Sequence, residues 1–352
     1  MPDYDVTIIG GGPAGTTAAI SCNRLGLKTL FVEMGQRNRQ KPCGGVLPRI
    51  CSDLIKETMG VSIPEHVMSE PASLGLYYVP PSGRKNSGVI KNYTLLNVDR
   101  TLFDQWLRDS AEEKGVEVLY DTTFQRLIED DIIQTSLNGA KSTQISTKYL
   151  IGADGVQSKV REHLFGPENR IAYVFQERLD ARGDFEDNFY AFLREDISPI
   201  YGYLIPKKDH IKIGIGIPEP YLKSSTAYMA RFKGWLTEEF QFQQKSILSR
   251  DVWGIPFGFS YYGKDHVLLA GDAAGFCNAF SGEGIRHAIN SGAAVGYAIE
   301  SDLENGEGLL EAYTYETRSL NVLVRNTHNF ATSLTDEKRE NYVKSELSRN
   351  FF

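Results

Sequence analysis

The period of the hydrophobic pattern changes twice within the first 33 residues. YDVTIIG (4–10) is a short apolar, β-rich run that predicts a buried strand. In PAGTTAAISCNRLG (13–26) small and apolar residues recur at helical spacing, and LKTLFVE (27–33) predicts a second strand. Because glycines separate the first strand from the helix, the pattern predicts a βαβ unit with a tight glycine turn.

Two later segments carry the helical period most clearly. Residues 98–115 predict an amphipathic helix with Asp99 as its N-cap and Gly115 at its end. The apolar face of this helix is predicted to comprise Leu102, Phe103, Trp106 and Leu107. Residues 284–303 predict a long helix with small residues on one face. Shorter helical patterns lie at 49–59 and near 224–242, and the tail from about 307 is helical and charged.

Strand-like patterns fill most of the remaining chain. They occupy 73–96, 116–148 and most of 171–250, whereas 36–48 is polar, rich in Gly and Pro, and predicted to be a loop. YLIGADG (149–155) and HVLLAGDAAG (266–275) each predict a buried strand that runs into a turn containing an aspartate.

Composition narrows the classes of partner and site. Lys and Arg number 38 against 45 Asp and Glu, and the formal net charge of −7 argues against nucleic acid as the main partner. The four cysteines and six histidines lack metal-ligand spacing, so we expect no metal and free thiols in a reducing cytoplasm. The first strand starts by Tyr4, so no signal peptide is expected. No apolar run is long enough to span a membrane, and peripheral membrane contact stays open.

The glycine turn has the spacing of a dinucleotide-binding motif. In Gly10-x-Gly12-x-x-Gly15 the first glycine permits the tight turn, the second lets the backbone approach a pyrophosphate, and the third lets the helix pack on the strand. Glu33 follows Gly15 by 18 residues, where an acid that binds ribose hydroxyls is expected. The alternative, a glycine turn without a ligand, is disfavoured by this order of elements, and the motif fits NAD and FAD equally.

Further motifs resemble one flavoprotein family. VDRTLFDQWL (98–107), IGADGVQSKVR (151–161), LAGDAAG (269–275) and FSGEGIRHAINSG (280–292) follow the glycine motif in the order typical of the FAD-dependent family of aromatic hydroxylases, flavin halogenases and geranylgeranyl reductases. The resemblance covers most of the chain and implies FAD as cofactor.

The resemblance also implies residue roles. Arg100 would lie near the adenosine diphosphate part of FAD, Asp272 would bind the ribitol chain, and the helix after SGEGI would point its N-terminus at the flavin, where reduced flavin is negative. The alternative for each is an ordinary turn, hinge or surface residue. The expected cofactor-binding residues are Gly10, Gly12, Pro13, Ala14, Gly15, Glu33, Cys43, Gly44, Gly45, Arg100, Asp154, Gly155, Gly271, Asp272, Gly282, Gly284 and Ile285.

Two stretches favour the geranylgeranyl reductase branch. PCGG (42–45) and SGEGI (281–285) are typical of it, and the halogenase stretch WxWxIP is absent. SPIYGYLIP (198–206) resembles the segment PxxYxWxFP that lines the isoprenoid cavity in that branch, so Tyr201, Tyr203 and Pro206 are candidate substrate residues. Tyr203 and Ile205 depart from the motif, which leaves the cavity shape open. An aromatic strand in a buried sheet is the alternative.

Cys43 is the candidate active-site thiol. In the reductase branch the loop that contains it runs past the flavin ring, and Gly44 and Gly45 let the backbone pass close. Cys43 would then donate a proton or position the alkene, and we favour this function over packing. Packing is the preferred interpretation for Cys22 and Cys51.

The resemblance implies an α/β (α+β) fold class. A Rossmann-like FAD/NAD(P)-binding domain of the glutathione-reductase and aromatic-hydroxylase type would carry an inserted antiparallel β-sheet substrate domain. The cofactor domain would comprise 1–72, 97–170 and 251–303, and the substrate domain 73–96 and 171–250. Residues 304–352 would form a short C-terminal helical segment, which implies either a smaller or more open cavity or a surface dock for a partner.

The expected function is reduction of C=C bonds in a polyprenyl group by hydride transfer from reduced flavin. Cys43 and Tyr201 are the expected catalytic residues. The electron donor would be NADPH or a ferredoxin-like protein, and the substrate a small-molecule isoprenoid or lipid. An alternative is an FAD-dependent monooxygenase or hydroxylase that uses NADPH and O2 on an aromatic compound or a partner protein. A third is a flavin-binding protein without catalysis.

Overall fold

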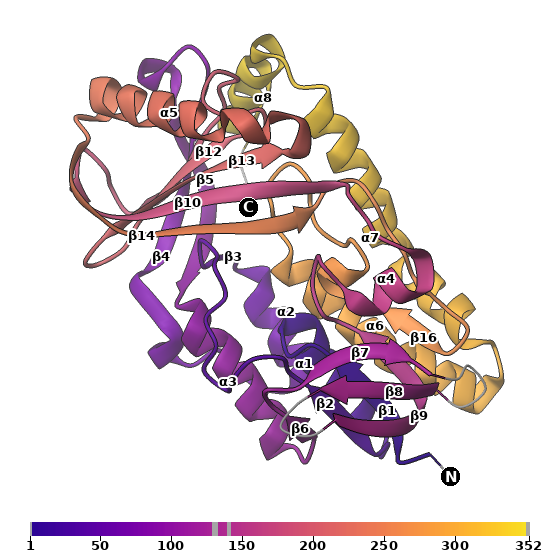
Figure 1. Ribbon diagram of the computed structural model, residues 1–352. Coiled ribbons are helices and arrows are strands. Elements are labelled where there is room, and N and C mark those ends of the chain that lie inside the picture. Colours follow the sequence, from indigo (N-terminus) through magenta and orange to yellow (C-terminus); the bar gives the residue numbers. More distant parts are fainter. Residues whose placement is uncertain (1, 129–132, 139–141, 350–352) are drawn as a thin grey trace.

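Two sheets organise the molecule, with helices around them (Figure 1). The computed structural model describes residues 2–128, 133–138 and 142–349. The mixed α/β architecture confirms the predicted fold class.

The first sheet contains the predicted βαβ unit. Strand β1 (Tyr4–Ile9) lies between β2 (Thr29–Val32) and β9 (Ser142–Gly152) and runs parallel to both. The sheet order is β15-β16-β9-β1-β2-β6, with β7 and β8 attached beside β9. The bounds of the other strands are β6 (Glu117–Leu119), β7 (Thr123–Leu127), β8 (Ile133–Asn138), β15 (Gly263–Lys264) and β16 (Val267–Leu269). The parallel strands end at one edge, where ligands bind in open α/β sheets.

Helix α1 (Pro13–Arg24) packs against α6 (Ile285–Asn305) through the small residues predicted on 284–303. A Cβ on Gly292 would lie 2.4 Å from the Ala14 carbonyl oxygen, and one on Gly296 would lie 2.7 Å from Ser21 Cβ. This close approach brings the N-termini of both helices to the same edge of the sheet. The neighbouring helices are α2 (Ile50–Met59), α3 (Arg100–Glu113), α4 (Lys159–Phe165) and α7 (Leu309–Thr332).

The second sheet is mostly antiparallel and has the order β14-β10-β13-β12-β11-β4-β5-β3. Helix α5 (Ser225–Phe240) covers one face, where Leu204 and Ile213 contribute to a core with Phe232 (Figure 1). Since side chains alternate across a strand, residues next to these in sequence face the first sheet. The strand bounds are β3 (Val46–Pro48), β4 (Met68–Val79), β5 (Gly88–Val98), β10 (Ile171–Arg182), β11 (Asn188–Phe192), β12 (Gly202–Pro206), β13 (Ile211–Pro218) and β14 (Gln243–Pro256).

The C-terminal part returns to the second sheet. Helix α7 extends from beside α6 towards α8 (Asp336–Ser348), which contacts β4 and β5 (Figure 1). Short 3₁₀ turns complete the fold: η1 (Glu65–Val67), η2 (Arg84–Asn86), η3 (Glu219–Ser224) and η4 (Gly271–Ala273). Within the described residues, no helix is both long and apolar enough to cross a membrane.

Two local predictions need correction. The predicted face of α3 is wrong at Leu102, whose side chain is 43% exposed, while the charged residues Asp104 and Arg108 are buried beside Phe103. The predicted loop 36–48 contains β3, because Val46 to Pro48 pair with β5. The predicted N-cap is confirmed, since the Asp99 carboxylate accepts hydrogen bonds from the backbone N–H groups of Thr101 and Leu102.

Candidate functional site

The glycine turn between β1 and α1 leaves one position open. Gly10 has a φ of +105°, and a Cβ there would lie 2.3 Å from the Ala153 carbonyl oxygen. A Cβ on Gly15 would lie 1.8 Å from the Gly10 carbonyl oxygen. A Cβ on Gly12, in contrast, would meet no atom within 4 Å. Gly10 and Gly15 are therefore required by the protein's own packing, whereas Gly12 faces free space at the N-terminus of α1.

Glu33 follows β2 and holds the turn from behind. Its carboxylate accepts hydrogen bonds from the backbone N–H groups of Gly11 (2.9 Å) and Gly35 (2.8 Å) and is paired with the guanidinium of Arg39. These four donors occupy the acceptor positions of a carboxylate. A ribose hydroxyl can therefore reach Glu33 only if Arg39 moves, so in this arrangement Glu33 orders the two loops.

Arg108 lies behind the glycine turn, and the sequence analysis did not identify it as a candidate residue. Its buried guanidinium donates to the carbonyl oxygen of Gly11 at 3.2 Å and to that of Arg37 at 2.5 Å. Arg108 thus ties α3 to both loops around the glycine turn. The signal was weak, because one arginine in an amphipathic helix is usually solvated.

A cavity of about 300 Å³ extends from the glycine turn to the second sheet. Its nucleotide side is formed by Gly12, Pro13, Ala14, Lys41, Pro42, Cys43, Gly44, Gly45, Arg100, Ala153, Gly155, Asp272, Cys277, Ser281, Gly282, Glu283, Gly284, Ile285 and Ala288. The remaining wall is mostly apolar: Val46, Leu47, Pro48, Leu76, Tyr78, Tyr93, Leu95, Val174, Phe189, Ala191, Leu193, Tyr201, Tyr203, Ile205, Trp253, Ile255 and Phe280. One cavity therefore joins both sheets.

The apolar wall is the face of the second sheet opposite α5. Tyr203 pairs with Ala191 across β11 and β12, and its ring occupies the space that a side chain on Gly214 would need. Val174 and Trp253 pair across β10 and β14 and continue the same face. Aromatic and aliphatic side chains thus present a continuous apolar surface to the cavity.

Cys43 lies where this wall meets the nucleotide side. Burial acts to raise the pKa of Cys43, but the guanidinium of Arg100 and the backbone N–H of Gly45 outweigh burial and leave the pKa below its usual value. Arg100 is held by Asp104, with both guanidinium–carboxylate contacts between 2.8 and 2.9 Å. Lys212 fixes the loop by donating to the carbonyl oxygen of Cys43 at 3.1 Å. Arg100 therefore lies at the thiol, already paired with a carboxylate.

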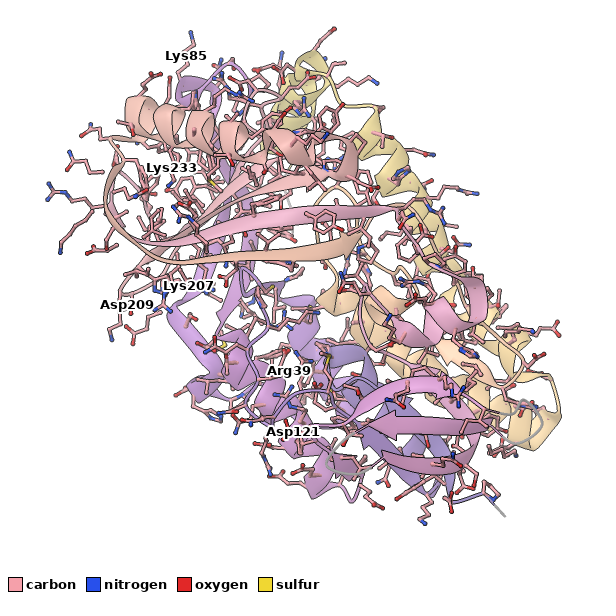
Figure 2. All side chains as sticks on the ribbon, in the orientation of Figure 1. Arg39, Lys85, Asp121, Lys207, Asp209 and Lys233 are labelled. Carbon is pink, nitrogen blue, oxygen red and sulfur yellow. The ribbon has the colours of Figure 1, made fainter. Side chains whose placement is uncertain are left out.

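A second half-buried lysine lies behind the cysteine loop. Lys207 Nζ donates to the side chains of Asn97 and Ser69, and Figure 2 shows Lys207 near Asp209 at one end of the second sheet. Burial, followed by the charge of Lys212, lowers the pKa of Lys207 to about 7.

The candidate substrate tyrosines line the cavity, whereas Pro206 does not. Tyr201 donates a hydrogen bond to the Ser281 carbonyl oxygen at 2.7 Å, and Tyr203 donates to Gln176 at 2.9 Å. Burial raises the pKa of both phenols. Both therefore stay protonated at neutral pH. Ile205, noted in the sequence only as a departure from the motif, contributes to the wall.

The turns after β9 and β16 form the opposite edge of the nucleotide side. Asp272 lies 3.8 Å from Lys41 Nζ at the cavity, beside the N-terminus of α6. Asp154 caps α4 by accepting from the Lys159 and Val160 backbone N–H groups. Its other oxygen, Oδ1, is buried without a hydrogen-bond partner among the described residues, and burial raises the pKa of Asp154.

These features fit the expected FAD. The free space at Gly12 accepts a phosphate at a helix N-terminus, and Asp272 and α6 supply polar groups on the facing wall. No cluster of His, Cys, Asp or Glu suited to a metal occurs in the described part of the chain.

The structure divides the expected cofactor-binding residues into two groups. The cavity is lined by Gly12, Pro13, Ala14, Cys43, Gly44, Gly45, Arg100, Gly155, Asp272, Gly282, Gly284 and Ile285. Gly10, Gly15, Glu33, Asp154 and Gly271 lie behind this lining. The sequence did not single out most of the apolar wall, including Tyr78, Leu193 and Trp253, because strands such as NFYAF (188–192) carry apolar residues on both faces and show no alternation.

Comparison with known proteins places this geometry in context. The family model described as FAD binding domain matches residues 3–172. The geranylgeranyl diphosphate reductase of Rhodobacter capsulatus is 31% identical over 322 residues, covering 86% of this chain and 77% of the relative. A geranylgeranyl bacteriochlorophyll reductase-like protein from Thermoplasma acidophilum has a TM-score of 0.83 at 19% identity, covering 99% and 92% of the two chains. PqsL, a probable FAD-dependent monooxygenase from Pseudomonas aeruginosa, has a TM-score of 0.73 at 19% identity, covering 97% and 99%.

Proposed function

The chain belongs to the FAD-dependent geranylgeranyl reductase family and is an FAD-dependent oxidoreductase, and from this premise we propose that it saturates C=C bonds of a polyprenyl group. The observation that carries the proposal is the apolar cavity that joins the nucleotide turn to the second sheet, with Cys43 at the junction. A polyprenyl chain has no polar group to recognise beyond its headgroup, so an apolar, aromatic wall is the surface that binds it.

The chemistry needs a hydride and a proton at the two carbons of one double bond. When bound and reduced, FAD supplies the hydride. We assign the proton to Cys43, whose pKa is shifted down towards the neutral range where a general acid works best. The thiol gives up its proton as the C–H bond forms, and Arg100 stabilises the resulting thiolate.

The remaining residues orient the alkene and exclude water. Tyr203 and Ile205 form the wall next to the cysteine loop, and Lys212 holds that loop in place. An isolated alkene is a weak hydride acceptor, so fixed geometry contributes more than tight binding. Tyr201 is the second proton donor that we propose. Its hydroxyl proton is already donated to the Ser281 carbonyl, so Tyr201 transfers it only after that bond breaks.

An anaerobic single turnover tests the proposal. The flavoprotein is reduced with dithionite, mixed with a geranylgeranyl lipid, and followed by flavin absorbance and product mass. We expect flavin reoxidation with two hydrogens gained per saturated bond. Cys43→Ala should slow this step by about 100-fold, within the range for losing a general acid. The matched control is Cys51→Ala, because Cys51 lies on α2 and is fully buried in the core, away from the cavity lining.

The same anaerobic experiment can also contradict the reductase proposal. Absence of reoxidation without oxygen, followed by rapid reoxidation with oxygen and an oxygen atom in the product, would replace the reductase proposal with a monooxygenase. Repeating the reduction with NADPH and with a reduced ferredoxin identifies the electron donor. A protein that no donor reduces would instead be a flavin-binding protein without this catalysis.

A further inference from the structure

Helix α8 forms a second layer behind the cavity wall at the side away from the glycine turn. Tyr78 and Phe280 line the cavity, and both contact Tyr342 of α8. The hydroxyl oxygens of Tyr78 and Tyr342 are 3.3 Å apart, and the ring centroids of Phe280 and Tyr342 are 5.3 Å apart. Tyr342 therefore backs two of the side chains that limit the cavity.

The same cluster continues around the end of the cavity. Ala191 and Leu193 line the cavity and belong to one apolar cluster with Phe280 and Val343. Phe330 of α7 packs against Phe280 with ring centroids 5.0 Å apart and against Tyr342 at 5.4 Å. The cavity thus ends against side chains that α7 and α8 hold from outside.

Polar anchors fix α8 on the sheet. The guanidinium of Arg339 is 1% exposed and donates to the Pro199 carbonyl oxygen at 2.6 Å. The Asp336 carboxylate accepts from the backbone N–H of Glu195 at 2.9 Å, and Glu340 accepts from Ser82 at the opposite rim. With anchors on both sides, α8 presents Tyr342 as a rigid support.

We propose that Tyr342 is the end-stop that limits the length of the prenyl chain, an inference that rests on the proposed function. The reacting double bond must lie near Cys43, so every carbon beyond it must fit between Cys43 and the wall that Tyr342 supports. The cavity of about 300 Å³ comprises the nucleotide side as well as the apolar wall, so the position of this wall decides which chains fit beside the cofactor.

Two substitutions move the wall in opposite directions. Tyr342→Ala removes the ring behind Tyr78 and Phe280, and these side chains can then move outward into the vacated space. Ala191→Phe adds a ring inside the cavity near the same end. Tyr342→Phe keeps the ring and removes only the hydroxyl, and Lys344→Ala changes an exposed position on the same helix. The last two serve as matched controls.

The experiment measures binding and turnover of geranyl, farnesyl and geranylgeranyl alcohols by the FAD-loaded protein. We expect Tyr342→Ala to raise the ratio of geranylgeranyl to geranyl affinity about tenfold, Ala191→Phe to lower it, and both controls to retain the wild-type ratio. If Tyr342→Ala does not fold, the direction of the change in Ala191→Phe decides. If Tyr342→Ala and Ala191→Phe both keep the wild-type ratio of geranylgeranyl to geranyl affinity, the inference about Tyr342 is overturned. This holds even if the wild-type protein reduces prenyl chains. If the wild type binds prenyl alcohols without reducing them, the proposed function fails and the affinity ratios still decide the inference.

Discussion

Cys43 and Cys277 both line the cavity, yet their surroundings act on them differently. At Cys277 burial raises the pKa, and the negative charge of Asp272 adds to that effect. At Cys43 burial is opposed and outweighed by Arg100. Identical side chains a short distance apart are therefore expected to differ in reactivity, because thiolates and not thiols are nucleophiles.

Alkylation by iodoacetamide should show this difference. At pH 7.5 we expect Cys43 to react first, with Cys277, Cys22 and Cys51 slower by at least about tenfold because burial raises their pKa values. Peptide mass spectrometry measures each rate. For Cys43, the rate should rise with pH to a midpoint below that of a free cysteine. A midpoint at or above the free value would show that Arg100 does not stabilise the thiolate.

Lys207 should make stability depend on pH. Its pKa is lowered from 10.5 to about 7, chiefly by burial, so between these values the unfolded chain binds one more proton than the folded chain. The free energy of unfolding should therefore rise with pH relative to Lys207→Met, by about 1.4 kcal/mol per pH unit in this window. Below about pH 7 the difference between the two proteins should be constant.

Denaturant unfolding between about pH 6 and pH 9.5 measures this slope. The control is Lys208→Met, because the Lys208 ammonium is exposed and the hydrogen bond and charge of Glu70 raise its pKa rather than lower it. Parallel stability curves for the wild type and Lys207→Met would contradict the lowered pKa. The outcome concerns only the slope, since Lys207→Met also removes hydrogen bonds to Asn97 and Ser69.

At this scale the sequence predicted the residues whose roles are set by nearby backbone. Gly10 and Asp99 belong to local turn and cap geometries that spacing reveals. Arg108 and Lys207 have roles set by partners about 100 residues away in the chain, Gly11 and Asn97. A pattern read along the chain does not contain those contacts.

In the strand–turn–helix element formed by β1 and α1, one glycine is required for packing and another is free to contact the cofactor. A Cβ on Gly12 meets nothing within 4 Å, and the backbone there has a φ of −85°, which alanine adopts readily. A Cβ on Gly15 meets the Gly10 carbonyl oxygen at 1.8 Å. Alanine at the two positions should therefore have different consequences.

We expect Gly12→Ala to fold with wild-type stability without FAD and to lose FAD affinity by at least about tenfold, or 1.4 kcal/mol, because its methyl occupies the approach of the phosphate. Gly15→Ala should cost about 3 kcal/mol of stability through overpacking. Thermal melts of the flavin-free proteins and flavin titrations separate the two effects. Equal loss of stability in both variants would show that Gly12 is also a packing position.

Other elements show where periodicity fails. In α3 the apolar period indicated Leu102, but the buried side also accommodates Arg100, Asp104 and Arg108, because ion pairing and carbonyl contacts satisfy their charges. In β11 every residue except Phe189 is buried. One face of the strand packs under α5 and the other lines the cavity, and both faces carry apolar side chains. Alternation is hidden in such a strand, which is why most of the cavity wall was not predicted.

Across the whole molecule the motifs predicted the nucleotide half better than the substrate half. Glycine turns and capped helices recur at fixed spacing because a dinucleotide imposes the same backbone on every chain that binds it. The second sheet meets a different requirement, an apolar surface, which many combinations of Tyr, Phe, Leu and Ile satisfy. Its order β14-β10-β13-β12-β11-β4-β5-β3 joins segments that lie far apart in the sequence.

The three tryptophans lie in three different parts of the molecule. Trp106 lies on α3 against Phe103, Trp235 lies on α5 and packs against Phe192 and Phe240, and Trp253 lines the cavity. A prenyl ligand in the cavity contacts only the last of these. We therefore expect farnesol to change the tryptophan emission of the wild type and of Trp106→Phe and Trp235→Phe, but not that of Trp253→Phe.

Steady-state fluorescence of the oxidised flavoprotein measures the change, and flavin absorbance confirms equal cofactor content in all four proteins. Loss of the signal only in Trp253→Phe would locate the ligand between the two sheets, as a shared substrate and cofactor cavity requires. Retention of the signal in Trp253→Phe and its loss in Trp235→Phe would instead place the ligand on the α5 side of the second sheet. Hydride transfer from the nucleotide half would then be impossible without rearrangement, because the sheet itself would separate donor and alkene.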